Sequence, residues 1–236
     1  MSVVIGVHPG GRSRFAVCAL FWQGRLPAMF FTSRAYSSVQ EVLEDIVGVV
    51  GEWGNINVMA VDAPLTWAAS VGGLRECDKK LRAHLPSWVP RTWVRAPNGQ
   101  SGAATIQGPA LVWALAREAK QGLLQLPEFC EAHARASLAR IANDLRTAVI
   151  GYRKRDLSQT TREKHLQTLV DRLIDTGLVK LEVARPASAD ELDALVCAVT
   201  ALGHAYPESG LIVRELPGDQ IRPVGKRSLY IIDGLP

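Results

Sequence analysis

The sequence predicts an α/β protein built on a mixed sheet whose first elements follow the order β-β-β-α-β. Three apolar segments open the chain, and tight turns rich in Gly, Pro and Arg separate them, which is typical of an antiparallel meander. An amphipathic helix then leads into a fourth apolar segment. A strand–helix–strand crossover of this kind places the fourth strand parallel to the first. The strands are predicted at Val3–Val7, Phe15–Trp22, Ala28–Thr32 and Asn57–Val61.

The crossover helix has a clear start and a clear stop. Ser38 begins the capping box Ser-Val-Gln-Glu, and the glycines at Gly51 and Gly54 end the helical pattern. Between them, apolar residues recur at helical spacing at Val39, Val42, Leu43, Ile46, Val47 and Val50.

The rest of the chain is predicted to be mostly helical. We interpret residues 1–236 as a single domain, with a helical and loop insertion at about 68–145. A second capping box, Ser-Ala-Asp-Glu, starts a late helix at Ser188 that runs to about His204. The remaining expected elements are a helix at Leu74–His84, a loop at Pro86–Pro109, helices at Ala110–Lys120 and Glu128–Leu145, a strand at Arg146–Tyr152, a helix at Thr161–Thr176 and an extended piece at Leu211–Glu215.

Composition is that of a soluble globular protein, with 47% hydrophobic and 21% charged residues. The net charge of +4 is compatible with a nucleic-acid partner, and equally with a slight arginine excess. The four cysteines lack C-x-x-C spacing, which favours a reduced, cytoplasmic protein without structural zinc. No basic segment precedes an apolar run at the start, and no apolar run approaches the ~20 residues that span a bilayer, so neither a signal peptide nor a membrane span is expected.

Polar residues follow two neighbouring strands of the predicted sheet. His8 follows the first strand and Asp62 the fourth, so both lie at the carboxyl edge, where ligand sites of open α/β sheets gather. Asp190 and Asp193 are three residues apart and share one face of the late helix. Asp190 in the first turn is also explained by the helix dipole, whereas Asp193 lies deeper, among apolar residues.

Four segments together resemble a known family: "IGVHPGGRSRFAVCAL", "AVDAPL", "RECDKKLR" and "DELDALVCAVTA". They are similar to the ribonuclease-H-like superfamily, whose relatives include Holliday-junction resolvases. The narrower resemblance is to domain-of-unknown-function family 429, a set of predicted nucleases, and it covers residue 3 to about 215. It implies a ribonuclease-H-like fold and a metal-dependent nuclease whose acids hold divalent cations, Mg²⁺ or Mn²⁺, for phosphodiester cleavage.

Carried over residue by residue, the resemblance implies metal ligands at His8, Asp62, Asp190 and Asp193, with Asp62 and Asp193 as the catalytic pair. Two positions depart from the family pattern. His8 replaces the first-strand acid, and the family motif V-I-E-x-x-P aligns with "VIGYRKR", which puts Gly151 in place of a glutamate. Imidazole is a poor ligand for Mg²⁺ and a better one for Mn²⁺. The alternative is a catalytically degenerate member that binds nucleic acid or protein, with His8 serving only as a turn residue.

Six residues are candidates for contact with a nucleic acid. Arg91 and Trp93 belong to a loop where tryptophan and arginine alternate, as in proteins that bind single strands by stacking bases on aromatic side chains. The alternative is that the tryptophans only anchor this loop by packing against the rest of the protein. Arg153 and Arg155 follow the predicted fifth strand, where a solvated turn is the alternative. The basic residues of "RECDKKLR", Arg75 and Arg82, complete the set. The choice between DNA and RNA and the oligomeric state stay open.

Overall fold

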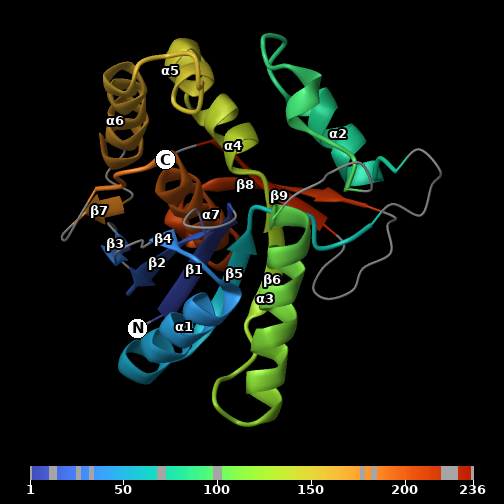
Figure 1. Cartoon of the computed structure of the whole chain (residues 1–236), viewed down its shortest axis with the longest axis vertical. Helices are drawn as coiled ribbons and strands as arrows, with labels where there is room; N and C mark the ends of the chain where they lie inside the picture. The colour runs from blue at the N-terminus through green and yellow to red at the C-terminus, as the bar shows by residue number, and fades with distance from the viewer. Residues whose placement is uncertain are drawn as a thin grey trace.

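A nine-stranded mixed sheet forms the centre of the computed structural model, counted over the residues that the structure describes (Figure 1). These are residues 2–10, 15–24, 28–31, 35–67, 73–97, 103–175, 179–181, 185–218 and 228–234. The strands are β1 (Ser2–Pro9), β2 (Phe15–Trp22), β3 (Ala28–Phe31), β4 (Ala35–Tyr36), β5 (Ile56–Val61), β6 (Glu128–Ala132), β7 (Val179–Leu181), β8 (Ile212–Pro217) and β9 (Ser228–Gly234). Their order is β7-β3-β2-β1-β5-β6-β9-β8, and β4 pairs with β2.

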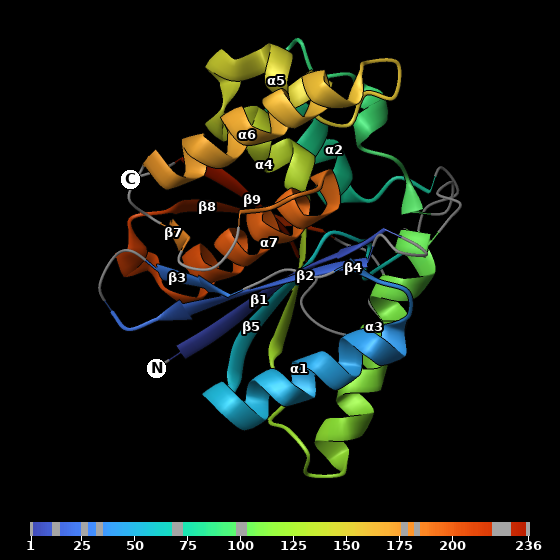
Figure 2. The same cartoon turned by 60° about the vertical axis from the view of Figure 1, so that its left-hand side comes forward.

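Helices cover both faces of this sheet. The α-helices are α1 (Val39–Trp53), α2 (Glu76–His84), α3 (Ala103–Lys120), α4 (Ala134–Ile141), α5 (Arg146–Gly151), α6 (Gln159–Asp175) and α7 (Ala189–Ala205). Short 3-10 turns follow at Arg91–Trp93, Asn143–Leu145 and Pro207–Ser209. Figure 2 shows α1 and α3 on one face of the sheet and α7 on the other, with α4, α5 and α6 beyond α7.

The predicted first half of the fold is confirmed. β1 pairs antiparallel with β2, β2 pairs antiparallel with β3, and β1 pairs parallel with β5 after the α1 crossover. β6 and β9 then extend the sheet in parallel beyond β5. This mixed order is the ribonuclease-H-like arrangement that the sequence predicts.

The alternation of side chains along β1 decides where His8 points. Val3, Ile5 and Val7 belong to the apolar core that contains the buried residues of α1 and α3, whereas Val4 belongs to the core that contains α7. Successive residues of a strand face opposite sides, so His8 has the same parity as Val4 and faces α7.

Gly6 allows α7 to lie directly against the sheet. A Cβ atom at Gly6 would lie 2.0 Å from the backbone nitrogen of Ala198 and 2.1 Å from the carbonyl oxygen of Ala194. Several small residues of this helix, among them Cys197 and Ala201, are fully buried there. This close packing fixes the start of α7, with Asp190 and Asp193, beside the carboxyl ends of β1 and β5.

The second half of the fold differs from expectation. The predicted helix over Glu128–Leu145 is wrong: the segment begins as β6 and becomes helical only at α4, whose start is capped by the His133 side chain, which accepts a hydrogen bond from Ala136 N. Because β6 lies between β5 and β9, the segment expected as an insertion contributes a central strand.

The predicted strand over Arg146–Tyr152 is also wrong, because this segment forms α5. Ala148 and Val149 are buried in the core that also holds Leu169 of α6. α3 begins at Ala103 instead of Ala110 and contains Pro109 within it. β4, β7 and β9 have no counterpart among the predicted elements. Thr32 and Thr176, the predicted ends of one strand and one helix, lie outside the described residues.

All four cysteines are buried and make no disulfide. Among the described helices, none is long and apolar enough to cross a membrane.

Candidate metal centre

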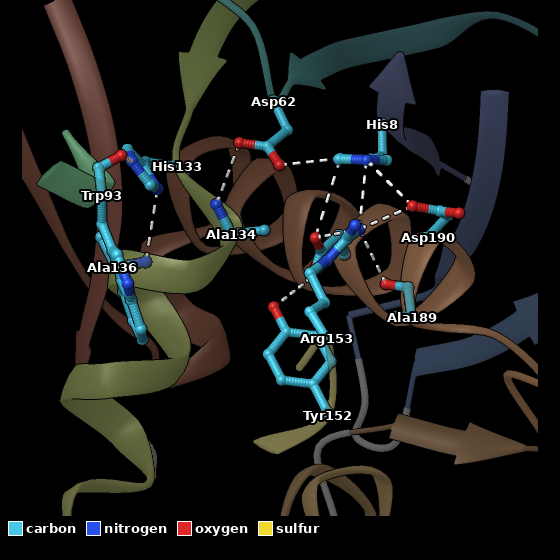
Figure 3. Close-up of polar contacts among 11 residues, drawn as sticks. His8, Asp62, Trp93, His133, Ala134, Ala136, Tyr152, Arg153, Ala189 and Asp190 are labelled. Atoms are coloured by element: carbon cyan, nitrogen blue, oxygen red, sulfur yellow. Dashed lines mark hydrogen bonds and ion pairs between the residues drawn. The ribbon is translucent and has the colours of Figure 1, made fainter. Parts of the chain in front are cut away.

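The structure brings His8, Asp62 and Asp193 together at the carboxyl edge of the sheet. Figure 3 labels His8 and Asp62 in this cluster. His8 Nδ1 lies 2.8 Å from Asp62 Oδ2 and 3.8 Å from Asp193 Oδ2. One ligand atom from each of the three residues lies within 4.8 Å of the others. The convergence expected from strand order is therefore present, and the role of these residues as metal ligands stays a prediction.

Backbone groups and one hydroxyl orient the two central carboxylates. The amide of Asp62 donates to Val7 O at 2.8 Å, which continues the pairing of β5 with β1 past the strand end. Asp62 Oδ1 accepts a hydrogen bond from Ala134 N, at the start of α4. Asp193 is almost fully buried, and Tyr152 donates its hydroxyl to Asp193 Oδ1 at 2.8 Å. Sequence reasoning missed this tyrosine.

Arg153 inserts one guanidinium nitrogen into the cluster. Its Nη2 lies 2.5 Å from Asp193 Oδ2 and 2.8 Å from Asp190 Oδ1. The same nitrogen lies 3.1 Å from His8 Nε2 and 3.2 Å from Ala189 O. Figure 3 shows these contacts converging from α7 and β1. A resident positive charge thus balances the acids of the cluster.

The charges of the cluster shift its titrations. Burial alone lowers the pKa of His8, but hydrogen bonds to Asp190 and Asp62, with the charge of Asp193, outweigh it and raise the pKa of His8 to about 9. Burial raises the pKa of Asp62 and Asp190, and in both the hydrogen bond with His8 reverses this and leaves the pKa below its ordinary value. Without a cation, the structure therefore favours a protonated His8 between ionised aspartates.

The donor set of the cluster fits one divalent cation in kind and in spacing. Asp62 and Asp193 offer carboxylate oxygens, and His8 offers one nitrogen, within reach of a common centre. A nitrogen ligand suits Mn²⁺ better than Mg²⁺, which prefers hard oxygen ligands. His8 must be deprotonated to coordinate, and Arg153 must give up Asp193, so both groups oppose cation binding.

A second buried polar cluster surrounds Glu131. Glu131, at the end of β6, accepts hydrogen bonds from the Arg75 guanidinium at 2.5 and 2.6 Å and from Leu65 N at 2.9 Å. Arg75 also donates to Asp78 at 2.7 and 2.9 Å and to Thr66 Oγ1 at 2.8 Å. This fixes the loop after β5 and the start of α2 against β6.

Glu131 therefore corrects the assignment of Gly151 to the middle-strand position. β6 is the strand that neighbours β5, and Val61 lies opposite Glu131 in the sheet, whereas Gly151 lies in α5 against His165. Glu131 stays outside the His8 cluster because its oxygens are held by Arg75.

The six candidate nucleic-acid residues differ in how far their side chains are exposed and in the contacts that they already make. Arg75 is 3% exposed and its donors are taken by acids, so it has no surface to offer a phosphate. Arg82 is half-buried and donates to Val94 O at 2.6 and 3.1 Å. The Trp93 ring is covered by the Arg135 guanidinium, whose central carbon lies 3.6 Å from the ring centre. Arg91 and Arg155 are exposed, and Arg153 belongs to the candidate metal centre.

Comparison with known proteins finds similarity to a family model and to a solved structure. The model of the protein family of unknown function DUF429 matches residues 6–215. A structure of T. thermophilus RuvC in complex with a Holliday junction substrate is 14% identical. The match covers 88% of this chain and 96% of that chain, with a TM-score of 0.39. That overlap is too loose to transfer any residue. No curated protein sequence matches this chain.

Proposed function

The chain belongs to the DUF429 family, and we propose that it is a divalent-cation-dependent, nuclease-like protein that acts on phosphodiesters of nucleic acids. The observation that supports this is the convergence of His8, Asp62 and Asp193 at the carboxyl edge of the sheet. Polar groups from two neighbouring parallel strands and a packed helix meet there, with ligand types that bind Mn²⁺.

Each residue of the cluster has a distinct proposed role. Asp62 and Asp193 hold the cation, and the contacts from Ala134 N and Tyr152 keep their carboxylates in place. His8 supplies the nitrogen ligand, and Asp190 lies next to it as a further oxygen donor. When bound, a divalent cation polarises a phosphoryl oxygen and lowers the pKa of an attacking water.

We expect the activity to be weak and to prefer Mn²⁺. A neutral imidazole brings no charge to the position where the family resemblance implies a carboxylate. The protonated His8 and the Arg153 guanidinium also have to be displaced from Asp62 and Asp193 before a cation binds.

A binding protein that does not cleave is the second candidate. The position of Arg153 Nη2 favours it, because that nitrogen already contacts Asp190, Asp193 and His8 as a cation would. In this candidate the ligand is a nucleic acid or a protein, and the acids serve only to hold Arg153.

The substitution His8→Asp tests the proposal. It restores an anionic oxygen ligand, and we expect the Mg²⁺ affinity to rise at least about tenfold, the effect that even outer-shell changes reach at metal sites. Cleavage of single- and double-stranded substrates should rise with it. The measurement is nuclease rate against concentration of Mn²⁺ and of Mg²⁺.

Two further variants make this experiment decisive. Asp62→Asn added to His8→Asp should remove the gain, whereas Asp175→Asn, at the exposed end of α6, should leave it intact. If His8→Asp neither binds Mg²⁺ more tightly nor cleaves faster, the binding candidate replaces the nuclease.

A further inference from the structure

An open cleft of about 730 Å³ lies beside the candidate metal centre and is lined by arginines. The arginines are Arg95, Arg135, Arg153, Arg155 and Arg162. The acids that line it, among the described residues, are Asp190 and Glu163, and both already have partners: Arg153 holds Asp190, and Gln159 donates to Glu163. Five guanidinium groups against two carboxylates give the cleft an excess of positive charge.

Several of these arginines have donors without a protein partner. Nε of Arg135 and Nε of Arg153 are buried, and neither has a hydrogen-bond partner among the described residues. The side chains of Arg155 and Arg162 likewise form no hydrogen bond or ion pair within the described part of the chain. Stacking on Trp93 holds the Arg135 guanidinium in place without using its donors. Buried donors without a partner are costly, and an anion in the cleft would satisfy them.

Two long helices also begin at this cleft. Ser188 and Ala189, at the start of the 17-residue α7, line it, and so does Gln159, the first residue of the 17-residue α6. The positive end of each helix dipole adds to the field of the arginines and favours an anion.

We propose that this cleft binds the phosphate backbone of a nucleic acid, and that Arg153 couples this binding to the binding of a cation by Asp62 and Asp193. The cation half of this statement rests on the function proposed above, and the phosphate half does not. Arginines spread around one open cleft suit a chain of phosphates better than a single phosphate, because different guanidinium groups can pair with different charges.

The coupling follows from the geometry of one guanidinium. An arginine grips a phosphate most strongly through two parallel N–H groups. In Arg153 the free donor is Nε, and its natural second donor in a side-on grip is Nη2, which now contacts Asp190 and Asp193. A phosphate held by both donors therefore withdraws Nη2 from the carboxylates. The carboxylates then lose one of their counter-charges beside an incoming anion, and a divalent cation can replace it.

This coupling must act in both directions. If nucleic acid strengthens cation binding, then the cation strengthens nucleic-acid binding by the same factor. The second quantity is the easier one to measure, by fluorescence anisotropy of a labelled oligothymidylate with the chain of 236 residues in EDTA and in Mn²⁺.

In EDTA the phosphate half is tested without any metal chemistry. We expect binding that weakens with salt, and Arg155→Gln and Arg162→Gln should each reduce the slope of log affinity against log salt by about 0.7, the value for one single-strand phosphate contact. Arg117→Gln is the matched control: Arg117 is 63% exposed on α3 and pairs with Glu118, so its slope should not change. An unchanged slope for both cleft variants, or equal binding of polyglutamate, would overturn the phosphate site.

Addition of Mn²⁺ tests the coupling. We expect the native chain to bind the oligonucleotide about fivefold or more tightly than the variant Asp193→Asn does under the same Mn²⁺, and Asp193→Asn to gain affinity in EDTA because Arg153 is released. Asp190→Asn is the second variant if Asp193→Asn does not fold. A native chain whose response to Mn²⁺ equals that of the variants would overturn the coupling.

Matching RNA and duplex probes identify which nucleic acid the cleft prefers. The outcomes also separate this inference from the proposed function. Binding that depends on the cleft arginines and on Mn²⁺, without cleavage by any variant, rejects the nuclease and supports the inference. Cleavage whose rate does not change in the Arg155→Gln and Arg162→Gln variants supports the nuclease and rejects the inference.

Discussion

Gly6→Ala is expected to destabilise the chain by about 3 kcal/mol, the upper end of overpacking effects in protein cores. The new methyl group would lie 2.0 Å from Ala198 N and 2.1 Å from Ala194 O. These are backbone atoms of a buried helix, so they cannot move aside as a flexible side chain can. The whole of α7 must shift from the sheet, and Asp190 and Asp193 shift with it.

The measurement for Gly6→Ala is urea unfolding followed by far-UV circular dichroism. Gly48→Ala is the matched control, because Gly48 lies in α1 with nothing within 4 Å of a new Cβ atom. Alanine at that helical position should stabilise the chain by about 0.5–1 kcal/mol. A Gly6→Ala protein as stable as the native chain would show that α7 does not pack as closely as described.

Arg75→Met is expected to have the other large effect, a loss of about 3–5 kcal/mol. The substitution leaves Glu131 and Asp78 buried without the guanidinium that both carboxylates now share. Burial already raises the pKa of Glu131 against the opposing charge of Arg75, and without Arg75 that carboxyl would protonate more readily. Glu131→Gln in the Arg75→Met background should therefore recover part of the stability.

Comparison with an exposed arginine gives the control for this prediction. Arg117→Met removes a surface ion pair with Glu118 and should change stability by less than about 1 kcal/mol. If Arg75→Met instead kept its stability and reduced the salt dependence of nucleic-acid binding, Arg75 would be a phosphate contact, as the sequence suggested, and not a structural residue.

The carboxyl edge of the sheet was predictable because its signals are local. Val3–Val7 and Asn57–Val61 are continuous apolar runs that end in a polar residue, and the α1 crossover fixes their relative direction. Because side chains alternate between the two faces along β1, His8 lies on the face that α7 covers. The late helix was predictable for the same reason, because its capping box is also a local signal.

β6 was missed because its signal is short. Only five residues form the strand, and α4 begins two residues after it ends. The alanines and the leucine after His133 recur at helical spacing, and in the sequence this pattern conceals the short strand before it. The apolar pair Phe129–Cys130 directly before Glu131 was the available signal, since it repeats the relation of Val61 to Asp62. Because a strand was predicted at Arg146–Tyr152 instead, the glutamate of the family motif was assigned to the position of Gly151.

The position of Arg153 was beyond sequence reasoning. The segment after α5 indicates positive charge near a turn, but nothing local says whether that charge meets a phosphate or a carboxylate. Its partners, Asp190 and Asp193, lie in the first two turns of α7, far from Arg153 in the sequence. In the structure, Arg153 contacts Asp190 and Asp193 and also lines the cleft where we propose that phosphates bind.

A cation held by His8, Asp62 and Asp193 is tested most directly by the anomalous difference map of a crystal soaked in Mn²⁺. We expect a peak within coordination distance of His8 Nδ1 or Nε2 and of carboxylate oxygens from Asp62 and Asp193, with Arg153 withdrawn from Asp193. A map without such a peak at saturating Mn²⁺, in which Arg153 Nη2 keeps its contacts with Asp190 and Asp193, would contradict the metal centre.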